Sequence, residues 1–220
     1  MCGRYSFAVE DALIMERFGV RVRTAIYKAR YNCAPGQDLA IISNEAPGML
    51  NFYRWGLAPP WASDPRSGYK FINAKAETIT EKPSFQDAFR KRRCLVPADS
   101  FFEWKKDKEK TPFRIMMKDE SPFSMAGIWD QWVSPDGEVI RSFSILTTSP
   151  NEMMASIHDR MPVIFHPQDE KKWIGNTSRE ELRELFQAFP SGKMKAYPVS
   201  RLVNSPKNDV PEILEPITLV

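Results

Sequence analysis

The chain has 220 residues, of which 42 % are hydrophobic and 27 % charged, and its formal net charge is +3 at pH 7. These values are ordinary for a globular protein with one core, and nothing in the length requires two domains. The mildly basic charge is compatible with nucleic acid without indicating it, and no apolar run approaches the roughly eighteen residues that a membrane-spanning helix needs.

Hydrophobic periodicity and turn residues predict many short strands between a few helices. In chain order, the pattern predicts a helix at 9–18, strands at 39–43 and 49–55, a helix at 84–91, two strands within 93–104, strands at 113–117, 123–129 and 139–147, a helix at 151–157, a strand at 161–165, helices at 167–174 and 178–189, and a strand at 193–199. The last helix opens with a capping box, Ser178 with Glu181. The tail, with Pro206, Pro211 and Pro216, is expected to run over the surface in extended form.

Three irregular segments interrupt this pattern. Residues 31–36 are interpreted as a turn, in which Pro35-Gly36 favours a tight loop that brings backbone close to another group. Residues 56–68 are too rich in proline for a helix or a central strand, and Trp61 lies among them. Residues 105–110 are all charged, which predicts a solvated hairpin tip. The whole pattern favours an α+β fold: a single domain, residues 1–220, of antiparallel, barrel-like β-sheets flanked by short helices.

The cysteines bear on the compartment. Cys2, Cys33 and Cys94 are widely spaced and form no CxxC or metal-ligand pattern. A reducing environment is therefore favoured over secretion. Because Met1-Cys2-Gly3-Arg4 is not followed by the apolar core of a signal peptide, we expect a cytoplasmic protein.

The first residues offer an unusual nucleophile. Removal of Met1, which is efficient before a small residue, would leave Cys2 with a free α-amine beside its thiol. Such an amine has a pKa near 8 and is partly neutral at pH 7. With an aldehyde, the amine forms an imine and the sulfur then closes a five-membered thiazolidine, an intramolecular and therefore favoured step. The alternative is an ordinary cysteine on a frayed terminus.

Some polar residues lie in apolar surroundings. Glu103 belongs to the run FFEW. An inward Glu103 would have a raised pKa and suit general acid–base catalysis, but alternation along the strand favours an outward position. His158 is either an acid–base group or a half-buried structural imidazole, and His166 is interpreted as structural. Asn73 is either a hydrogen-bonding group of a site or an ordinary turn residue.

Several cations adjoin apolar residues. Arg4, Lys75 and Arg160 are candidates for binding a phosphate backbone, with surface ion pairs as the alternative. Trp61 is either a stacking surface for a base or a plug at the rim of the core. Residues 91–93 form either a basic patch or a solvated helix end.

A set of longer motifs runs along nearly the whole chain: MCGR, YNCAPGQ, WGLAPPW, INAKAET, RCLVPADSFFEW, IHDRMPVI and VSRLVN. With these motifs in this order, the sequence resembles the SOS response-associated peptidase family, also described as abasic-site processing proteins. The resemblance implies an α+β fold with a positively charged groove for single-stranded DNA that contains abasic sites. It implies no cofactor and no metal ion.

The resemblance also assigns roles to residues. Cys2 would form the thiazolidine with the opened sugar, Asn73 would hydrogen-bond that sugar, and Glu103 would shuttle protons. His158 would help to open the ring and to reverse the adduct. The implied DNA contacts are Arg4, Lys75 and Arg160 at phosphates, with Pro35, Gly36 and Trp61 in the wall of the groove.

Three positions depart from the family pattern. Lys75 stands where the family often has arginine, so the charge is kept and the bidentate fork is lost. Ala62 follows Trp61 where some relatives carry a second tryptophan. Ser100 replaces a common glycine.

The function implied by the resemblance is an abasic-site sensor that crosslinks covalently to the lesion through Cys2 after the protein has removed its own Met1, and that shields the lesion during the DNA damage response. One alternative is a cysteine-dependent peptidase using Cys2, Glu103 and His158, and another is a non-covalent module for single-stranded DNA. We expect a monomer without membrane contact that is nucleoid-associated when bound to DNA. The replication machinery is a candidate partner.

Overall fold

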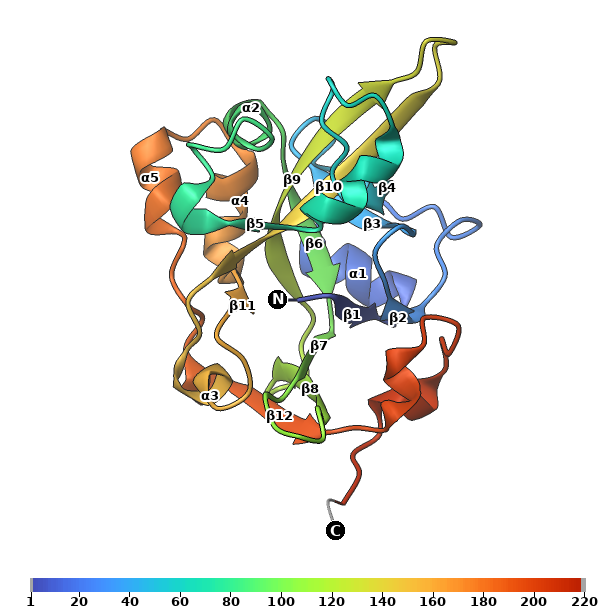
Figure 1. Ribbon diagram of the computed structural model, residues 1–220, viewed down its shortest axis with the longest axis vertical. Helices are drawn as coiled ribbons and strands as arrows, with labels where there is room; N and C mark the ends of the chain where they lie inside the picture. The colour runs from blue at the N-terminus through green and yellow to red at the C-terminus, as the bar shows by residue number, and fades with distance from the viewer. Residues whose placement is uncertain (1, 219–220) are drawn as a thin grey trace.

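The computed structural model describes residues 2–218, which form two β-sheets with short helices around them (Figure 1). The strands are β1 (Arg4–Phe7), β2 (Arg30–Cys33), β3 (Asp38–Ser43), β4 (Asn51–Trp55), β5 (Asn73–Lys75), β6 (Arg93–Ala98), β7 (Ser100–Trp104), β8 (Pro112–Met117), β9 (Phe123–Val133), β10 (Val139–Thr148), β11 (Met161–Pro162) and β12 (Met194–Pro198). The α-helices are α1 (Asp11–Phe18), α2 (Gln86–Lys91), α3 (Glu152–Ala155), α4 (Pro167–Ile174) and α5 (Arg179–Glu184). The 3₁₀ helices are η1 (Pro65–Phe71), η2 (Ala76–Thr78), η3 (Ser191–Lys193), η4 (Arg201–Asn204) and η5 (Pro211–Leu214). No helix within residues 2–218 is long and apolar enough to cross a membrane.

Strands β10, β4, β3, β6 and β9 close into a barrel. The hydrogen-bonded order returns to its start because β9 pairs with β10 as well as with β6. The β4–β10 pair is parallel, and the other pairs of the ring are antiparallel. β5 is attached to β10 in parallel, which fixes Asn73 opposite Ile145 at the side of the barrel. The outer ends of β9 and β10 project beyond the barrel as a hairpin (Figure 1).

The second sheet is antiparallel throughout, in the order β12-β8-β7-β1-β2. β1, drawn in dark blue, lies in the middle of the fold and is held by β2 on one side and β7 on the other (Figure 1). Its register places Arg4 opposite Phe102. Continued toward the start of the chain, the same register brings Cys2 to the end of β7 that carries Glu103.

The main apolar core fills the barrel and the space between the two sheets. Trp55, Phe101 and Phe143 are among its fully buried side chains. A smaller cluster, separate from the main core, joins Phe102 of β7 to Val199, Val203 and Ile213 of the C-terminal segment. Because Phe101 and Phe102 point to opposite faces, β7 is covered on both sides.

The α+β fold class and most predicted elements are confirmed, and local signals explain several helix ends. α1 ends at Gly19, whose φ of 65° lets its N–H reach the Met15 carbonyl. α5 begins with the predicted capping box of Ser178 and Glu181. The prediction that this helix continues to Phe189 is wrong, because it ends at Glu184 and the chain turns so that Phe186 and Phe189 pack onto neighbouring rings.

The prediction of an extended tail is also wrong. The tail contains η4 and η5, which present Val203 and Ile213 to Phe102. The Ser200 side chain accepts a hydrogen bond at the start of η4, and Pro211 occupies the first turn of η5, where its missing N–H costs nothing. These short turns bury apolar side chains that an extended tail would leave in water.

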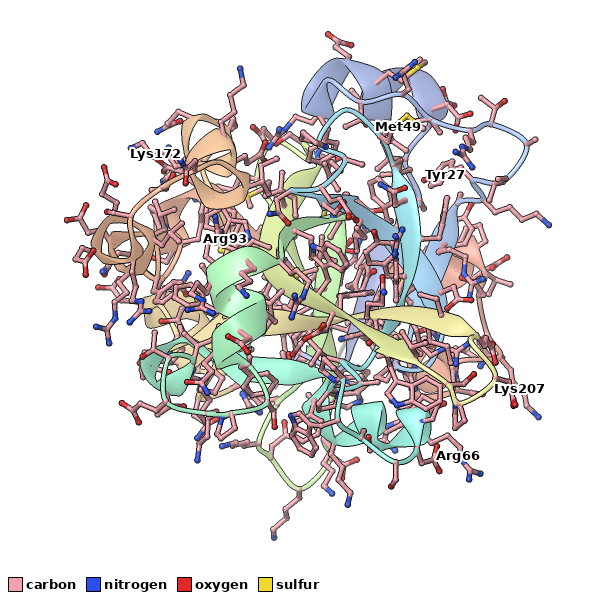
Figure 2. The ribbon with its side chains drawn as sticks, turned by 90° about the horizontal axis from the view of Figure 1, so that it is seen from above. Tyr27, Met49, Arg66, Arg93, Lys172 and Lys207 are labelled. Carbon is pink, nitrogen blue, oxygen red and sulfur yellow. The ribbon has the colours of Figure 1, made fainter. Side chains whose placement is uncertain are left out.

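Arg93 satisfies the ends of two helices at once. Its guanidinium donates to carbonyls near the end of α2 and near the end of α4: those of Phe89, Arg90, Trp173 and Gly175. The last carbonyls of a helix have no partner within it, so a single buried cation can serve both. Figure 2 shows Arg93 between these helices. The alternatives of a basic patch and a solvated helix end therefore both fail at Arg93.

Candidate active site

Cys2 is fixed by a contact that joins the two sheets. Its side chain is 0 % exposed, and its carbonyl accepts a hydrogen bond of 2.8 Å from Nδ2 of Asn73. The Cys2 thiol donates to the Arg4 carbonyl, with Sγ and O 3.6 Å apart. Asn73 Oδ1 is buried and accepts no hydrogen bond from residues 2–218. A ligand hydroxyl at this point would supply the missing donor.

Glu103 points inward, so the outward position favoured by alternation is wrong. Its residue exposure is 2 %. Alternation separates a wet face from a dry one only when one face of the strand is solvated, and here the Phe102 face is covered by the C-terminal segment. Burial raises the pKa of Glu103 to about 7. A carboxyl with this pKa can both accept and donate a proton near neutral pH.

His158 follows α3 and faces Glu103. Its Nε2 lies 4.0 Å from Oε2 of Glu103, and burial lowers the pKa of the imidazole. On the other side of the ring, the backbone N–H of Arg160 donates to Nδ1 at 3.1 Å, and Oδ1 of Asp159 lies 3.0 Å from the same nitrogen. The ring is therefore positioned from both of its nitrogens.

The Cys2 thiol is protonated in these surroundings. Burial raises its pKa, and the charge of Glu103 raises it further. Because the thiolate is the nucleophile, a base must take this proton when the sulfur reacts. Glu103 is the carboxylate whose charge acts on the thiol, and with a pKa of about 7 it suits that task.

The structure brings together the four residues expected to form the catalytic set. Cys2 comes from the start of the chain, Asn73 from β5, Glu103 from β7 and His158 from the loop after α3. Contacts or electrostatic effects link them in a series: Asn73 to Cys2, Cys2 to Glu103, and Glu103 to His158. Their chemical roles stay predictions.

Arg160 and Lys75 lie near this set. The Arg160 guanidinium donates to both carboxylate oxygens of Glu77, at 2.6 and 2.8 Å, and to the Thr147 carbonyl. Lys75 is exposed and carries its charge close enough to help lower the pKa of Glu77, an effect in which the Arg160 hydrogen bond is the largest cause. A phosphate reaching Arg160 would have to compete with a carboxylate that is already bidentate.

Arg4 is committed to the fold in this structure. It donates to Oδ1 of Asn32 at 3.0 Å and to the carbonyls of Val203 and Asn204 at 2.6 and 3.0 Å. Arg4 thus ties η4 to β1 and β2. Its predicted contact with phosphate is untested.

The predicted groove wall contains a further aromatic residue, Tyr69. Gly36 has a φ of 86°, and a Cβ built on it would overlap the Tyr69 hydroxyl. Tyr69 is 60 % exposed and Trp61 is 68 % exposed. The loop that carries Trp61 is anchored by Trp132, whose Nε1 donates to the Ala62 carbonyl at 2.7 Å. Tyr69 lies in η1, which the sequence did not predict. The available signal was Asp64-Pro65: the Asp64 side chain accepts a hydrogen bond from the Arg66 N–H at the start of η1, and Pro65 occupies its first turn.

The chain is similar to known proteins along nearly its whole length. The family model for SOS response associated peptidase (SRAP) matches residues 1–206. The abasic site processing protein YoqW of Bacillus subtilis (strain 168) is 46 % identical over 222 residues, which cover 98 % of this chain and 99 % of YoqW. The abasic site processing protein YedK of Escherichia coli (strain K12) is 31 % identical over 228 residues, which cover 99 % of this chain and 100 % of YedK. A crystal structure of a protein from Bacteroides thetaiotaomicron, 31 % identical, matches with a TM-score of 0.89 over 99 % of this chain and 100 % of that one.

Proposed function

Because the chain belongs to the SOS response-associated peptidase family, we propose that it processes abasic sites in single-stranded DNA and crosslinks to them through Cys2. YoqW and YedK are named for abasic site processing. The observation that carries the proposal is the convergence of Cys2, Asn73, Glu103 and His158 from four separate segments. Met1 lies outside the described residues, and its removal is part of the proposal.

The first step opens the sugar. An abasic deoxyribose is mostly a cyclic hemiacetal, and only its open form has an aldehyde at C1′. The C1′ hydroxyl loses its proton to the Glu103 carboxylate while the C1′–O4′ bond breaks and O4′ takes a proton from His158. Asn73 Oδ1, which is buried and accepts no bond from residues 2–218, accepts a hydrogen bond from the new hydroxyl.

The next steps form the crosslink. The Cys2 amine adds to C1′, and its extra proton moves to the former aldehyde oxygen. Glu103 then gives its proton to that hydroxyl, which departs as water and leaves a protonated imine. The thiol adds to this imine: Glu103 takes the thiol proton as the C–S bond forms, the nitrogen keeps its hydrogen, and the proton on Glu103 passes to His158, which gave one up in the first step. One aldehyde and one aminothiol thus give one thiazolidine and one water. The raised pKa of Glu103, about 7, keeps both of its protonation states accessible in this sequence.

Ring closure protects the DNA. An imine at C1′ acidifies the C2′ hydrogens and permits β-elimination of the 3′ phosphate, which nicks the strand. A thiazolidine has no such electrophilic carbon. A site that supplied only an amine would therefore cleave the DNA strand at the lesion, whereas the aminothiol of Cys2 shields the lesion from cleavage.

Binding to single-stranded DNA is proposed to rest on backbone charge and stacking. Lys75 is exposed near the site, and Trp61 and Tyr69 offer exposed rings on which bases can stack. Such contacts do not read base edges, so binding should depend little on sequence and should weaken as salt rises.

A denaturing gel tests the crosslink. We expect a heat-stable shifted band when the protein meets a single-stranded oligonucleotide with one abasic site, and no band with a tetrahydrofuran analogue that lacks the aldehyde. Cys2→Ser should abolish the band. Cys33→Ser, the same change at another buried cysteine, should keep it. Binding that survives only on native gels would instead indicate a non-covalent DNA-binding module.

The same residues support a second activity, removal of Met1 by the protein itself. Cys2, which follows the bond to be cut, is held by Asn73 beside Glu103. Water would attack the Met1 carbonyl, and Glu103 would carry the proton of that water to the departing amine of Cys2. If Glu103→Gln retains Met1 in its intact mass while the wild type has lost it, self-removal is supported. If both the wild type and Glu103→Gln have lost Met1, a host aminopeptidase removes it.

A further inference from the structure

Two neighbours make opposite demands on Nδ1 of His158. The backbone N–H of Arg160 donates to this nitrogen at 3.1 Å, which requires a lone pair on it. Oδ1 of Asp159 lies 3.0 Å from the same nitrogen, a contact that is favourable only when Nδ1 carries a hydrogen. The neutral ring, with its proton on Nε2, satisfies Arg160. A ring with a hydrogen on Nδ1, as in the doubly protonated state, satisfies Asp159.

Asp159 is itself held from a second loop. Its Oδ2 pairs with Nζ of Lys106 at 2.8 Å. Lys106 lies in the turn between β7 and β8, and β7 carries Glu103. The pair therefore connects the loop of His158 to the hairpin of Glu103, the two groups whose side chains are 4.0 Å apart.

The charged groups that face His158 come from several elements. Glu103 faces Nε2 from β7, and Asp159 faces Nδ1 from the same loop. Lys105 and Lys106, from the β7–β8 turn, line an open pocket of about 300 Å³ with His158 and Asp159. Cys2 would add its amine from the start of the chain once Met1 is gone. Burial opposes the charged ring and is the largest effect, Asp159 favours the charged ring, and Lys106 opposes it.

We propose that Asp159 is a positioning residue that stabilises the doubly protonated state of His158, and that Lys106 tempers this effect by pairing with Asp159. The inference rests on the proposed function for its catalytic meaning: a ring that accepts a proton at Nδ1 can give up the one at Nε2 to O4′. Asp159 receives no proton in this scheme. Its negative charge compensates the positive charge of the His158 ring before the sugar binds.

The two partners predict shifts of opposite sign. A carboxylate near 3 Å in a water-like dielectric changes the titration midpoint of the ring by about one pH unit. Asp159→Asn should therefore lower the midpoint of His158 by about that amount. Lys106→Met should raise it by about a few tenths of a unit, since this cation is farther from the ring and exposed. A role limited to bracing the two loops would shift both variants in the same direction.

NMR titration measures this without DNA. The chain has two histidines, so His166→Gln identifies the remaining imidazole signal as that of His158. Lys108→Met removes a charge of the same sign from the same turn and serves as the matched control, with no shift expected. Shifts of the same sign in Asp159→Asn and Lys106→Met, or none in either, would overturn the proposal.

The rate of crosslinking provides the second readout. The limb of its pH profile that depends on His158 should move toward acid in Asp159→Asn and toward base in Lys106→Met, with DNA affinity in Asp159→Asn unchanged. If the NMR midpoints shift while the pH profile of the crosslinking rate stays unchanged, the titration of His158 does not control catalysis, and the catalytic part of the proposal is overturned. If the wild-type protein forms no crosslink, the proposed function is wrong. The NMR titration would still decide whether Asp159 stabilises the doubly protonated His158.

Discussion

Glu103→Gln should stabilise the protein as it inactivates it. The structure buries this carboxyl with an exposure of 2 % and raises its pKa from 4.5 to about 7. Below about pH 4.5 the group is protonated in both the folded and the unfolded state, so it contributes no pH dependence. Between about pH 4.5 and 7 only the unfolded state ionises, and the folded state loses stability as the pH rises. Above about pH 7 the loss is complete.

The size of the effect follows from the shift. A pKa raised by 2.5 units, from 4.5 to about 7, corresponds to about 3 kcal/mol at about 1.4 kcal/mol per unit. Glutamine stays neutral and has nearly the same shape, so it removes this penalty. For a chain of this size, about 3 kcal/mol corresponds to a rise in Tm of roughly 6–12 °C. The crosslinking rate should fall at every pH, while affinity for single-stranded DNA should stay close to that of the wild type.

Thermal unfolding of both proteins from pH 4 to 9 provides the assay. The Tm difference between Glu103→Gln and the wild type should be near zero at pH 4 and should grow until about pH 7 to 8. Glu138→Gln makes the same chemical change on an exposed residue and should show no such trend. A Tm difference that does not vary with pH, or a variant that loses stability relative to the wild type as the pH rises, would contradict the burial of Glu103 as a neutral carboxyl. Equal loss of crosslinking and of DNA affinity would show that Glu103 is structural.

Three further predictions concern single residues. Cys2→Ser should lose the heat-stable band but keep DNA binding on native gels, and loss of both would contradict a role confined to the crosslink. Gly36→Ala should lower the free energy of unfolding by at least about 1–2 kcal/mol in denaturant titrations, because its φ is 86° and its Cβ would overlap Tyr69. An unchanged midpoint would contradict this. Trp61→Ala, at a ring that is 68 % exposed, should leave Tm within about 2 °C but weaken binding of single-stranded DNA by roughly 5- to 100-fold in a fluorescence titration. Wild-type affinity would remove Trp61 from the binding surface.

Local chemistry made much of the fold predictable. Gly19 ends α1 because it adopts a positive φ, and Ser178 with Glu181 begins α5 because the two side chains satisfy the first free N–H groups. The charged run 105–110 forms the expected turn between β7 and β8. Each of these signals lies within a few residues of the feature that it predicts.

The orientation of Glu103 could not be predicted in that way. Alternation placed it outward because it assumes that one face of the strand meets water. The face of Phe102 is covered by Val203 and Ile213, about a hundred residues later in the chain. The prolines of the C-terminal segment predicted an extended tail, and an extended tail would not have buried the Phe102 face of β7.

The partners of the cations could not be predicted from nearby residues either. Arg160 binds Glu77, and Arg4 binds the carbonyls of Val203 and Asn204, all distant in sequence. The sequence indicated an anionic partner for each cation and left open whether it was DNA or an ion pair within the protein. Arg160 pairs with a carboxylate of the protein, whereas Arg4 binds carbonyls, and the DNA contacts stay predictions.

The intact mass of the protein after incubation with a single-stranded abasic oligonucleotide shows whether Cys2 forms a covalent bond with the lesion. Chains that begin at Cys2 should shift by the mass of the oligonucleotide less one water, without a reducing agent and after denaturation. An unshifted protein mass beside intact or nicked oligonucleotide would contradict the account.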